Sequence, residues 1–136
     1  MSEFQLHPGL DADTLNVSTL AVAQVLLMND SRYPWLVLVP RIAHARELHS
    51  LEETTRHTLN NEIQLCTTAL ERHCQPYKMN VATLGNQVEQ LHIHIVARRQ
   101  SDAAWPAPVW GVGKAEAYDK DSADELIASI QRLIDA

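Results

Sequence analysis

The pattern of apolar and polar positions divides the chain into strand-length and helix-length segments. Residues 21–28 and 35–39 are short apolar runs separated by polar turn residues, which predicts two buried strands paired as an antiparallel hairpin. Residues 78–84 predict a third strand, and residues 90–97 predict a fourth because apolar and polar side chains alternate strictly there. The first twenty residues are mixed, and Asp13-Thr14 is a possible helix start among them.

Two later segments have helical spacing. In the first, apolar residues recur on one face, and Ser50 followed by Glu53 matches a capping box at its start. In the second, near the end of the chain, Ser122 and Glu125 form the same pattern. The two apolar stripes consist of Leu59, Ile63, Cys66 and Leu70, and of Leu126, Ile127, Ile130, Leu133 and Ile134. The chain is therefore predicted to have a long central helix and an amphipathic C-terminal helix.

Together these elements predict an α+β fold with an antiparallel β-sheet, in which residues 1–136 form a single domain. Residues 103–113 hold tryptophan, proline and glycine and are expected to form an extended arm or loop. Cys66 is best explained as a core residue, and its spacing from Cys74 matches neither a zinc site nor a disulfide scaffold. The N-terminus does not resemble a signal peptide, and no apolar run is long enough to span a membrane, so we expect a cytoplasmic protein.

Composition limits the ligands. Lys and Arg number 11 and Asp and Glu 17, which gives a formal charge of −6. This balance argues against a nucleic-acid-binding surface, because phosphate affinity there comes mainly from Lys and Arg. A small phosphate ligand remains possible, since main-chain N–H groups and a few neutral side chains can hold it. The chain also has seven histidines, of which only some can have a chemical role.

The most informative segment is Gln90-Leu91-His92-Ile93-His94-Ile95-Val96. On a strand, Gln90, His92 and His94 would share one face, and the apolar residues between them the other. Three interpretations follow from this arrangement. First, the strand could be half exposed and simply have histidines on its polar face. Second, the two histidines could bind zinc, although no third ligand has a recognisable spacing. Finally, a neutral imidazole could attack phosphorus and carry the phosphoryl group as a covalent intermediate.

Residues 85–96 resemble the signature of the histidine triad superfamily, a Gly-Gln/Asn turn followed by His-φ-His-φ-His-φ-φ, where φ is apolar. The resemblance covers most of the chain, including the hairpin, the long helix and the Lys78-Met79-Asn80 strand. The segment Ala104-Trp105-Pro106-Ala107-Pro108 is similar to the Trp-Pro-Pro tail of the nucleotide-binding branch. The resemblance implies an enzyme that attacks the α-phosphate of a nucleotide derivative and hydrolyses or transfers the nucleotidyl group.

The resemblance also implies roles for individual residues. His92 would be the nucleophile, with its Nδ1–H held by the main-chain carbonyl of Gln90 so that Nε2 faces phosphorus. His94 would hydrogen-bond the phosphate or belong to the polar network of the pocket. The expected substrate contacts are Gly85, Asn86 and Gln87 in the turn, Asn29 and Asn80 near phosphate or ribose, and Trp105, which could reach a partner subunit's pocket or pack on its own domain.

Two positions depart from the family pattern. Gln90 replaces the first motif histidine, and Trp35 stands where the family often has a fourth histidine. Gln can donate and accept hydrogen bonds but cannot carry a proton as imidazole does. Because general acid–base help is worth roughly 10²–10⁴-fold, the loss of a relay histidine would slow the reaction without abolishing it.

Two hypotheses follow. The leading one is a histidine triad hydrolase acting on a dinucleoside polyphosphate or a nucleoside phosphoramidate, as a homodimer by resemblance. It needs no cofactor, although a divalent ion can accompany a polyphosphate substrate. The alternative is a nucleotide-binding module with little or no turnover, because Gln90 and Trp35 break the usual histidine set.

Overall fold

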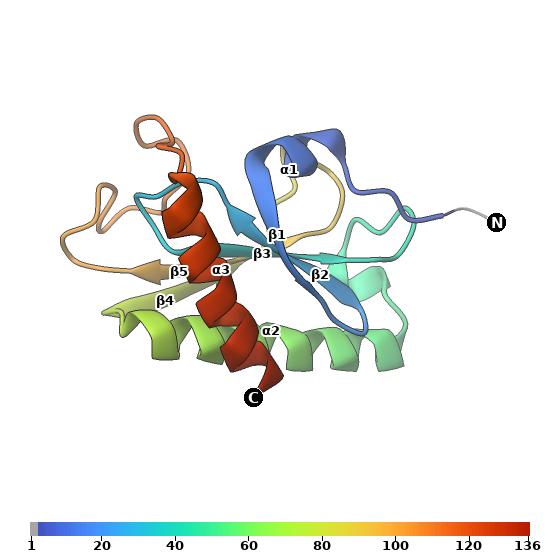
Figure 1. Ribbon diagram of the computed structural model, residues 1–136. Helices are drawn as coiled ribbons and strands as arrows, with labels where there is room; N and C mark the ends of the chain where they lie inside the picture. Colours follow the sequence, from blue (N-terminus) through green and yellow to red (C-terminus); the bar gives the residue numbers. More distant parts are fainter. Residues whose placement is uncertain (1–2) are drawn as a thin grey trace.

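A five-stranded antiparallel sheet with strand order β1-β2-β3-β5-β4 organises the fold (Figure 1), in a computed structural model that describes residues 3–136. This arrangement confirms the predicted α+β class. Within the described residues, none of the helices is long and apolar enough to cross a membrane. The elements are α1 (Pro8–Asp13), β1 (Thr14–Thr19), β2 (Ala23–Met28), β3 (Trp35–Pro40), the 3-10 helix η1 (Leu48–Ser50), α2 (Glu53–Cys74), β4 (Lys78–Ala82), β5 (Ile93–Arg98) and α3 (Lys120–Asp135).

The sheet has a core on each face. Helices α2 and α3 cover one face, while the short helix α1 lies over the other (Figure 1). Successive side chains of a strand point to opposite faces of the sheet. In β5, Ile93 and Ile95 therefore pack in the core on the α2 side, and Val96 packs in the core on the α1 side. Cys66 is fully buried in the core between the sheet and α2, which confirms that it is a core residue, and burial raises the pKa of its thiol to about 12.

The predicted hairpin is confirmed as β2 and β3, which pair antiparallel with Leu26 opposite Val37. Strand β5 then pairs with β3, and His94 lies opposite Val37. Because β5 is flanked by β3 and β4, the strand that carries the motif is an interior strand of the sheet. The expectation of a half-exposed motif strand is wrong, since His92 is 6 % exposed and His94 5 %.

Sequence reasoning missed the first strand. The possible helix start at Asp13-Thr14 is instead the end of α1 and the beginning of β1. Strand β1 has a register shift between Asn16 and Ser18, and Val17 is its one fully buried residue, so its residues show no clear period of two.

Both predicted capping boxes are wrong. Helix α2 begins at Glu53, after Glu52, and no side chain caps it, whereas Ser50 lies in η1. Helix α3 begins at Lys120, because Asp119 accepts a hydrogen bond from the main-chain N–H of Ser122. The fourth strand begins at Ile93 rather than at residue 90, so Gln90 precedes it.

A buried carboxylate joins α2 to the sheet. Glu62 is 7 % exposed, and its two oxygens accept hydrogen bonds from the main-chain N–H groups of Val22, at 2.9 Å, and Ala23, at 2.8 Å. These amides lie at the start of β2, next to the turn from β1. Glu62 therefore gives the turn the hydrogen-bond acceptors that buried main-chain amides need.

We expect Glu62→Ala to lower the free energy of unfolding by about 2–4 kcal/mol, because it leaves two amides without an acceptor. Urea unfolding followed by circular dichroism measures this change. Glu71→Ala, an exposed position on the same helix, is the matched control and should change stability by less than about 0.5 kcal/mol. Equal effects of the two substitutions would contradict the role assigned to Glu62.

Candidate active site

A cavity of about 370 Å³ lies on the α1 side of the sheet, next to the motif histidines. Helix α1, the turn that precedes β5 and the loop that follows β5 form most of its wall, and strands β2, β3 and β5 add one residue each. Its lining is mixed, with apolar walls and few polar groups, as is usual for small-molecule sites. The lining residues are Gly9, Leu10, Asp13, Met28, Trp35, Leu84, Gly85, Asn86, Gln87, Val88, His92, His94, Trp110 and Gly111.

His92 is held in one tautomer by the main chain. Its Nδ1 lies 2.6 Å from the carbonyl oxygen of Gln90, so Nδ1 carries the proton and donates it to that oxygen. The carbonyl of His92 in turn accepts a hydrogen bond from the hydroxyl of Thr83 at 2.7 Å. Within residues 3–136, Nε2 has no hydrogen-bond partner and is not sealed from solvent. His92 therefore offers an unshared electron pair on Nε2 to the cavity.

His94 is held in the opposite tautomer by a side chain. The indole N–H of Trp35 lies 3.0 Å from Nδ1 of His94. The two residues are diagonal neighbours on one face of the β3–β5 pair, because Val37 lies opposite His94. Since indole nitrogen can only donate, Nδ1 of His94 must accept, and the proton of the neutral ring is on Nε2.

Burial keeps His94 uncharged. Desolvation and, to a smaller extent, the neighbouring His92 together lower its pKa from 6.5 to about 4. The two imidazole rings are 4.7 Å apart, and Trp110 packs edge-on against His94 at 5.0 Å. At neutral pH the cavity thus contains one imidazole that can accept a proton or bond at Nε2, and one that can donate a hydrogen bond.

The replacement of the first motif histidine by Gln90 has a structural consequence. The side-chain oxygen of Gln90 accepts from the main-chain N–H of His7 at 2.8 Å, and its amide group donates to the carbonyl of Gln5 at 2.8 Å. This pair of bonds ties the N-terminal segment to the motif. His7 then caps α1 through a bond from Gly9, so Gln90 positions the helix that covers the cavity.

The structure brings together five of the predicted site residues. Gly85, Asn86 and Gln87 line the cavity with His92 and His94. Gly85 has φ +80°, a conformation that glycine adopts without strain. Within residues 3–136, the main-chain N–H groups of this turn donate no hydrogen bond, so the turn can receive an anion.

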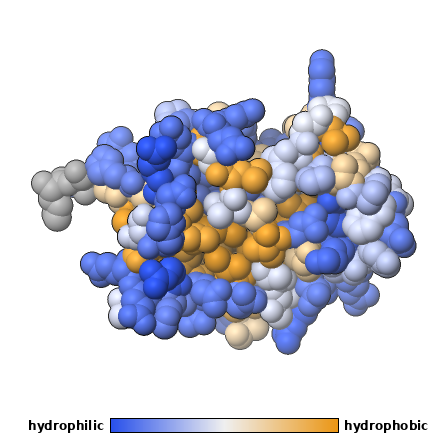
Figure 2. Space-filling model, turned by 180° about the vertical axis from the view of Figure 1, so that it is seen from behind, coloured by the Kyte–Doolittle hydropathy of each residue, from blue (hydrophilic) through white to orange (hydrophobic). Residues whose placement is uncertain are grey.

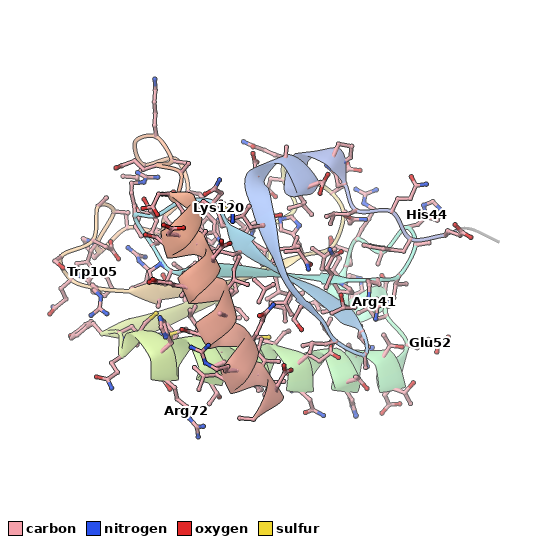
Figure 3. The ribbon with its side chains drawn as sticks, in the orientation of Figure 1. Arg41, His44, Glu52, Arg72, Trp105 and Lys120 are labelled. Atoms are coloured by element: carbon pink, nitrogen blue, oxygen red, sulfur yellow. The ribbon has the colours of Figure 1, made fainter. Side chains whose placement is uncertain are left out.

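The structure does not bring three other predicted residues to the cavity. The side-chain oxygen of Asn29 accepts from the main-chain N–H of Tyr118 at 2.9 Å. That of Asn80 accepts from Arg98 at 2.8 Å, and Arg98 is itself buried. Trp105 lies on the outer loop beyond β5 (Figure 3), where its ring is 5.4 Å from the guanidinium of Arg98. Trp105 thus packs on its own domain, and a reach into a partner's pocket stays a prediction.

Sequence reasoning missed the residues of α1 and the loop that complete the cavity. Gly9, Leu10 and Asp13 come from the N-terminal segment, which the sequence pattern left unassigned. Trp110 and Gly111, from the segment that was expected only to form an extended arm or loop, both line the cavity. The loop that bears them is held by Arg32, which donates to the carbonyl of Val112 at 2.7 Å. A tryptophan pair in a loop near the motif was the available signal for Trp110.

The zinc interpretation finds no cluster to support it. Among residues 3–136, no three His, Cys, Asp or Glu side chains are grouped so that they could hold a metal ion. In addition, Nδ1 of each motif histidine already has a hydrogen-bond partner.

Comparisons with known proteins identify the family. Residues 12–101 match the sequence model of the family described as HIT domain. A histidine triad protein from Bradyrhizobium japonicum is 42 % identical, with a TM-score of 0.96, and the match covers 98 % of this chain and 99 % of that one. One from Sinorhizobium meliloti is 40 % identical over 95 % and 96 %, with a TM-score of 0.93. One from Marinobacter aquaeolei is 39 % identical over 98 % of both chains, with a TM-score of 0.95.

The chain therefore belongs to the histidine triad family, whose members are in general nucleotide-binding hydrolases and transferases. A search of the curated proteins finds no match.

The depressed pKa of His94 predicts a pH-dependent stability. As pH falls from about 6.5 to about 4, the unfolded state takes up a proton on this ring before the folded state does. Stability is therefore lost over that range, by about 2 kcal/mol between about pH 7 and about pH 4.5. His94→Gln keeps an acceptor for Trp35 and should remove most of this loss, as measured by urea unfolding at the two pH values.

His57→Gln is the control, because His57 is exposed on α2. It should leave the pH dependence of stability as it is in the wild type. A His94→Gln protein that loses stability with acid as steeply as the wild type would contradict the assigned state of His94.

Proposed function

We propose that this protein is a nucleotide hydrolase or nucleotidyl transferase that attacks the α-phosphate of its substrate through His92. The substrates expected from the family pattern are dinucleoside polyphosphates and nucleoside phosphoramidates. The observation that carries the proposal is the bond from Nδ1–H of His92 to the carbonyl of Gln90, because in the neutral ring this bond places the unshared electron pair on Nε2, the nitrogen that has no hydrogen-bond partner within residues 3–136. This is the state that a nucleophilic imidazole needs.

The reaction would proceed in two steps. Nε2 of His92 forms a bond to the α-phosphorus, and the bond from phosphorus to the leaving group breaks. The positive charge that this creates on the ring is stabilised at Nδ1–H by the carbonyl of Gln90. Water then attacks phosphorus, the electron pair of the P–N bond returns to Nε2, and the nucleoside monophosphate is released with a proton to solvent.

Neutral donors would hold the phosphate, because no Lys or Arg lines the cavity among residues 3–136. Residues 85–87 line the cavity, and their main-chain N–H groups, which donate no hydrogen bond within residues 3–136, and the side-chain amides of Asn86 and Gln87 would be the donors. Nε2–H of His94 adds a further donor beside His92. An acidic chain can therefore bind an anion locally, and the apolar walls around Leu10 and Met28 suit a nucleobase.

We expect His92→Ala to lower kcat at least about 10³-fold, because the covalent path needs Nε2. The assay incubates the protein with a diadenosine polyphosphate and with an adenosine phosphoramidate and measures the released mononucleotide. Acid quenching followed by mass spectrometry should find the nucleotidyl adduct on His92.

His73→Ala, on the far end of α2, is the control and should keep the wild-type rate. If the wild type shows neither turnover nor adduct but binds nucleotide, the protein is a binding module, and the hydrolase proposal fails.

We also propose a homodimer that uses the outer strand β4. Among residues 3–136, this strand lies at one edge of the sheet, and no strand pairs with its outer side. The large apolar side chains that are most exposed in the described residues include Tyr77 at 65 %, Val81 at 47 % and Leu84 at 48 %, all on β4 or beside it. Seen from behind, the molecule has a broad apolar area (Figure 2), of the kind that marks an interface.

We expect Val81→Lys to weaken self-association at least about tenfold without unfolding the chain, because it puts a charge on this edge. Sedimentation equilibrium measures the association. Ala115→Lys, at an exposed loop position that does not belong to β4, is the matched control and should associate as the wild type does. A monomeric wild-type protein, or equal association of the two variants, would contradict a dimer through β4.

A further inference from the structure

Trp35 and His94 form a contact that nucleophilic attack by His92 does not by itself require. Trp35 is 6 % exposed and His94 5 %, and their bond from indole N–H to Nδ1 is 3.0 Å long. Tyr33 packs against Trp35 with ring centres 6.4 Å apart, and Trp110 packs against it at 6.0 Å. The indole is thus fixed on two sides, and its N–H is aimed at one ring nitrogen of the motif.

This contact determines how His94 can take part in the chemistry. Protonation of His94 would place a second hydrogen on Nδ1, where the hydrogen of Trp35 already lies. The imidazolium would lose this bond and leave the buried indole N–H without an acceptor. Desolvation acts in the same direction and lowers the pKa of His94 to about 4. Trp35 therefore favours a neutral ring with its hydrogen on Nε2.

On the basis of the proposed function, we propose that Trp35 keeps His94 as a neutral hydrogen-bond donor that does not transfer its proton. The site then cleaves phosphoanhydrides in preference to phosphoramidates. Trp35 is then a positioning residue that determines specificity through His94. The position that often holds a histidine in this family would here set the class of leaving group.

The preference for phosphoanhydrides follows from whether the leaving group needs a proton in the first step. When a phosphoanhydride is cleaved, the P–O electron pair goes to the leaving phosphate, which departs as a stable anion and needs no proton. Nε2–H of His94 can hydrogen-bond that oxygen and remain intact. When a phosphoramidate is cleaved, the P–N electron pair goes to nitrogen, and the amine must receive a proton to leave.

The cavity offers few sources for that proton. The titratable side chains that line it, among residues 3–136, are Asp13, His92 and His94. Nε2 of His92 becomes bonded to phosphorus, and its Nδ1–H is held by the carbonyl of Gln90. His94 keeps its hydrogen as long as Trp35 occupies Nδ1. Asp13→Asn therefore serves as the variant that tests whether a carboxyl group supplies the proton.

The first experiment determines the tautomers of His94 and His92 in the absence of substrate. Two-bond ¹H–¹⁵N correlation spectra of the ¹⁵N-histidine-labelled protein at neutral pH should show hydrogen on Nε2 of His94 and on Nδ1 of His92. The His94 assignment comes from comparison with His94→Gln. A His94 that is protonated on Nδ1, or on both nitrogens, would overturn the inference whatever the enzyme hydrolyses.

The second experiment compares leaving groups. The wild type should have a kcat/KM for a diadenosine polyphosphate at least about 10²-fold higher than for an adenosine phosphoramidate, the scale of general acid catalysis. Trp35→Gln supplies an amide that can accept from Nδ1–H, so His94 can become protonated. It should shift the ratio toward the phosphoramidate by about tenfold or more, and should steepen the gain in phosphoramidate rate as pH falls.

Tyr33→Phe is the matched control, because it alters the buried aromatic neighbour of Trp35 without touching His94 or the cavity. It should keep the wild-type ratio, and Asp13→Asn should also keep it. A wild type that prefers the phosphoramidate, or a ratio that Trp35→Gln leaves unchanged, would overturn the inference. If Trp35→Gln does not fold, the tautomer of His94 and the ratio of the two kcat/KM values in the wild type still test the inference.

Failure of the proposed function has a different signature. A protein that turns over neither substrate would contradict hydrolysis by His92, and with it the preference for one leaving group. A protein that turns over both while His94 is protonated on Nδ1 would leave the hydrolase proposal standing and overturn only the role of Trp35.

Discussion

A polar ring buried in the interior strand of a sheet must find hydrogen-bond partners from its neighbours, and this requirement governs the site. His94 is 5 % exposed on β5, and the indole of Trp35 on β3 satisfies its Nδ1. His92 satisfies its own Nδ1 with the carbonyl of Gln90, a residue just before β5. Because one partner donates and the other accepts, two imidazoles of the same strand region have opposite tautomers and opposite chemistry.

The rest of the fold maintains this arrangement. One face of β5 packs against α2, and this contact fixes the strand. The side chain of Gln90 bonds the N-terminal segment to the motif, so that α1 covers the cavity. Gln90 therefore has a structural role at the first motif position, because its side-chain amide accepts from one main-chain N–H and donates to one main-chain carbonyl of the N-terminal segment. The acidic net charge does not oppose phosphate binding, since the donors that face the cavity are neutral.

The sequence predicts those parts of the fold that have a strong period. The β2–β3 hairpin and the stripe of α2 are correct because burial on one or both faces leaves a clear apolar pattern. Strand β1 was missed because its bulge interrupts alternation, and the start of α3 was misplaced because Asp119 caps it ahead of Ser122. The His92–Gln90 bond was expected from the resemblance to the family, and the structure contains it. The Trp35–His94 bond joins residues 59 apart in sequence, and no local pattern encodes such a pairing.

The two motif histidines hold their hydrogens on different nitrogens. A neutron diffraction structure of the wild-type protein at neutral pH locates these hydrogens directly. We expect hydrogen on Nδ1 of His92, directed at the carbonyl of Gln90, and hydrogen on Nε2 of His94, with the indole hydrogen of Trp35 directed at Nδ1. Hydrogen on Nδ1 of His94, or on Nε2 of His92 in the free enzyme, would contradict this assignment.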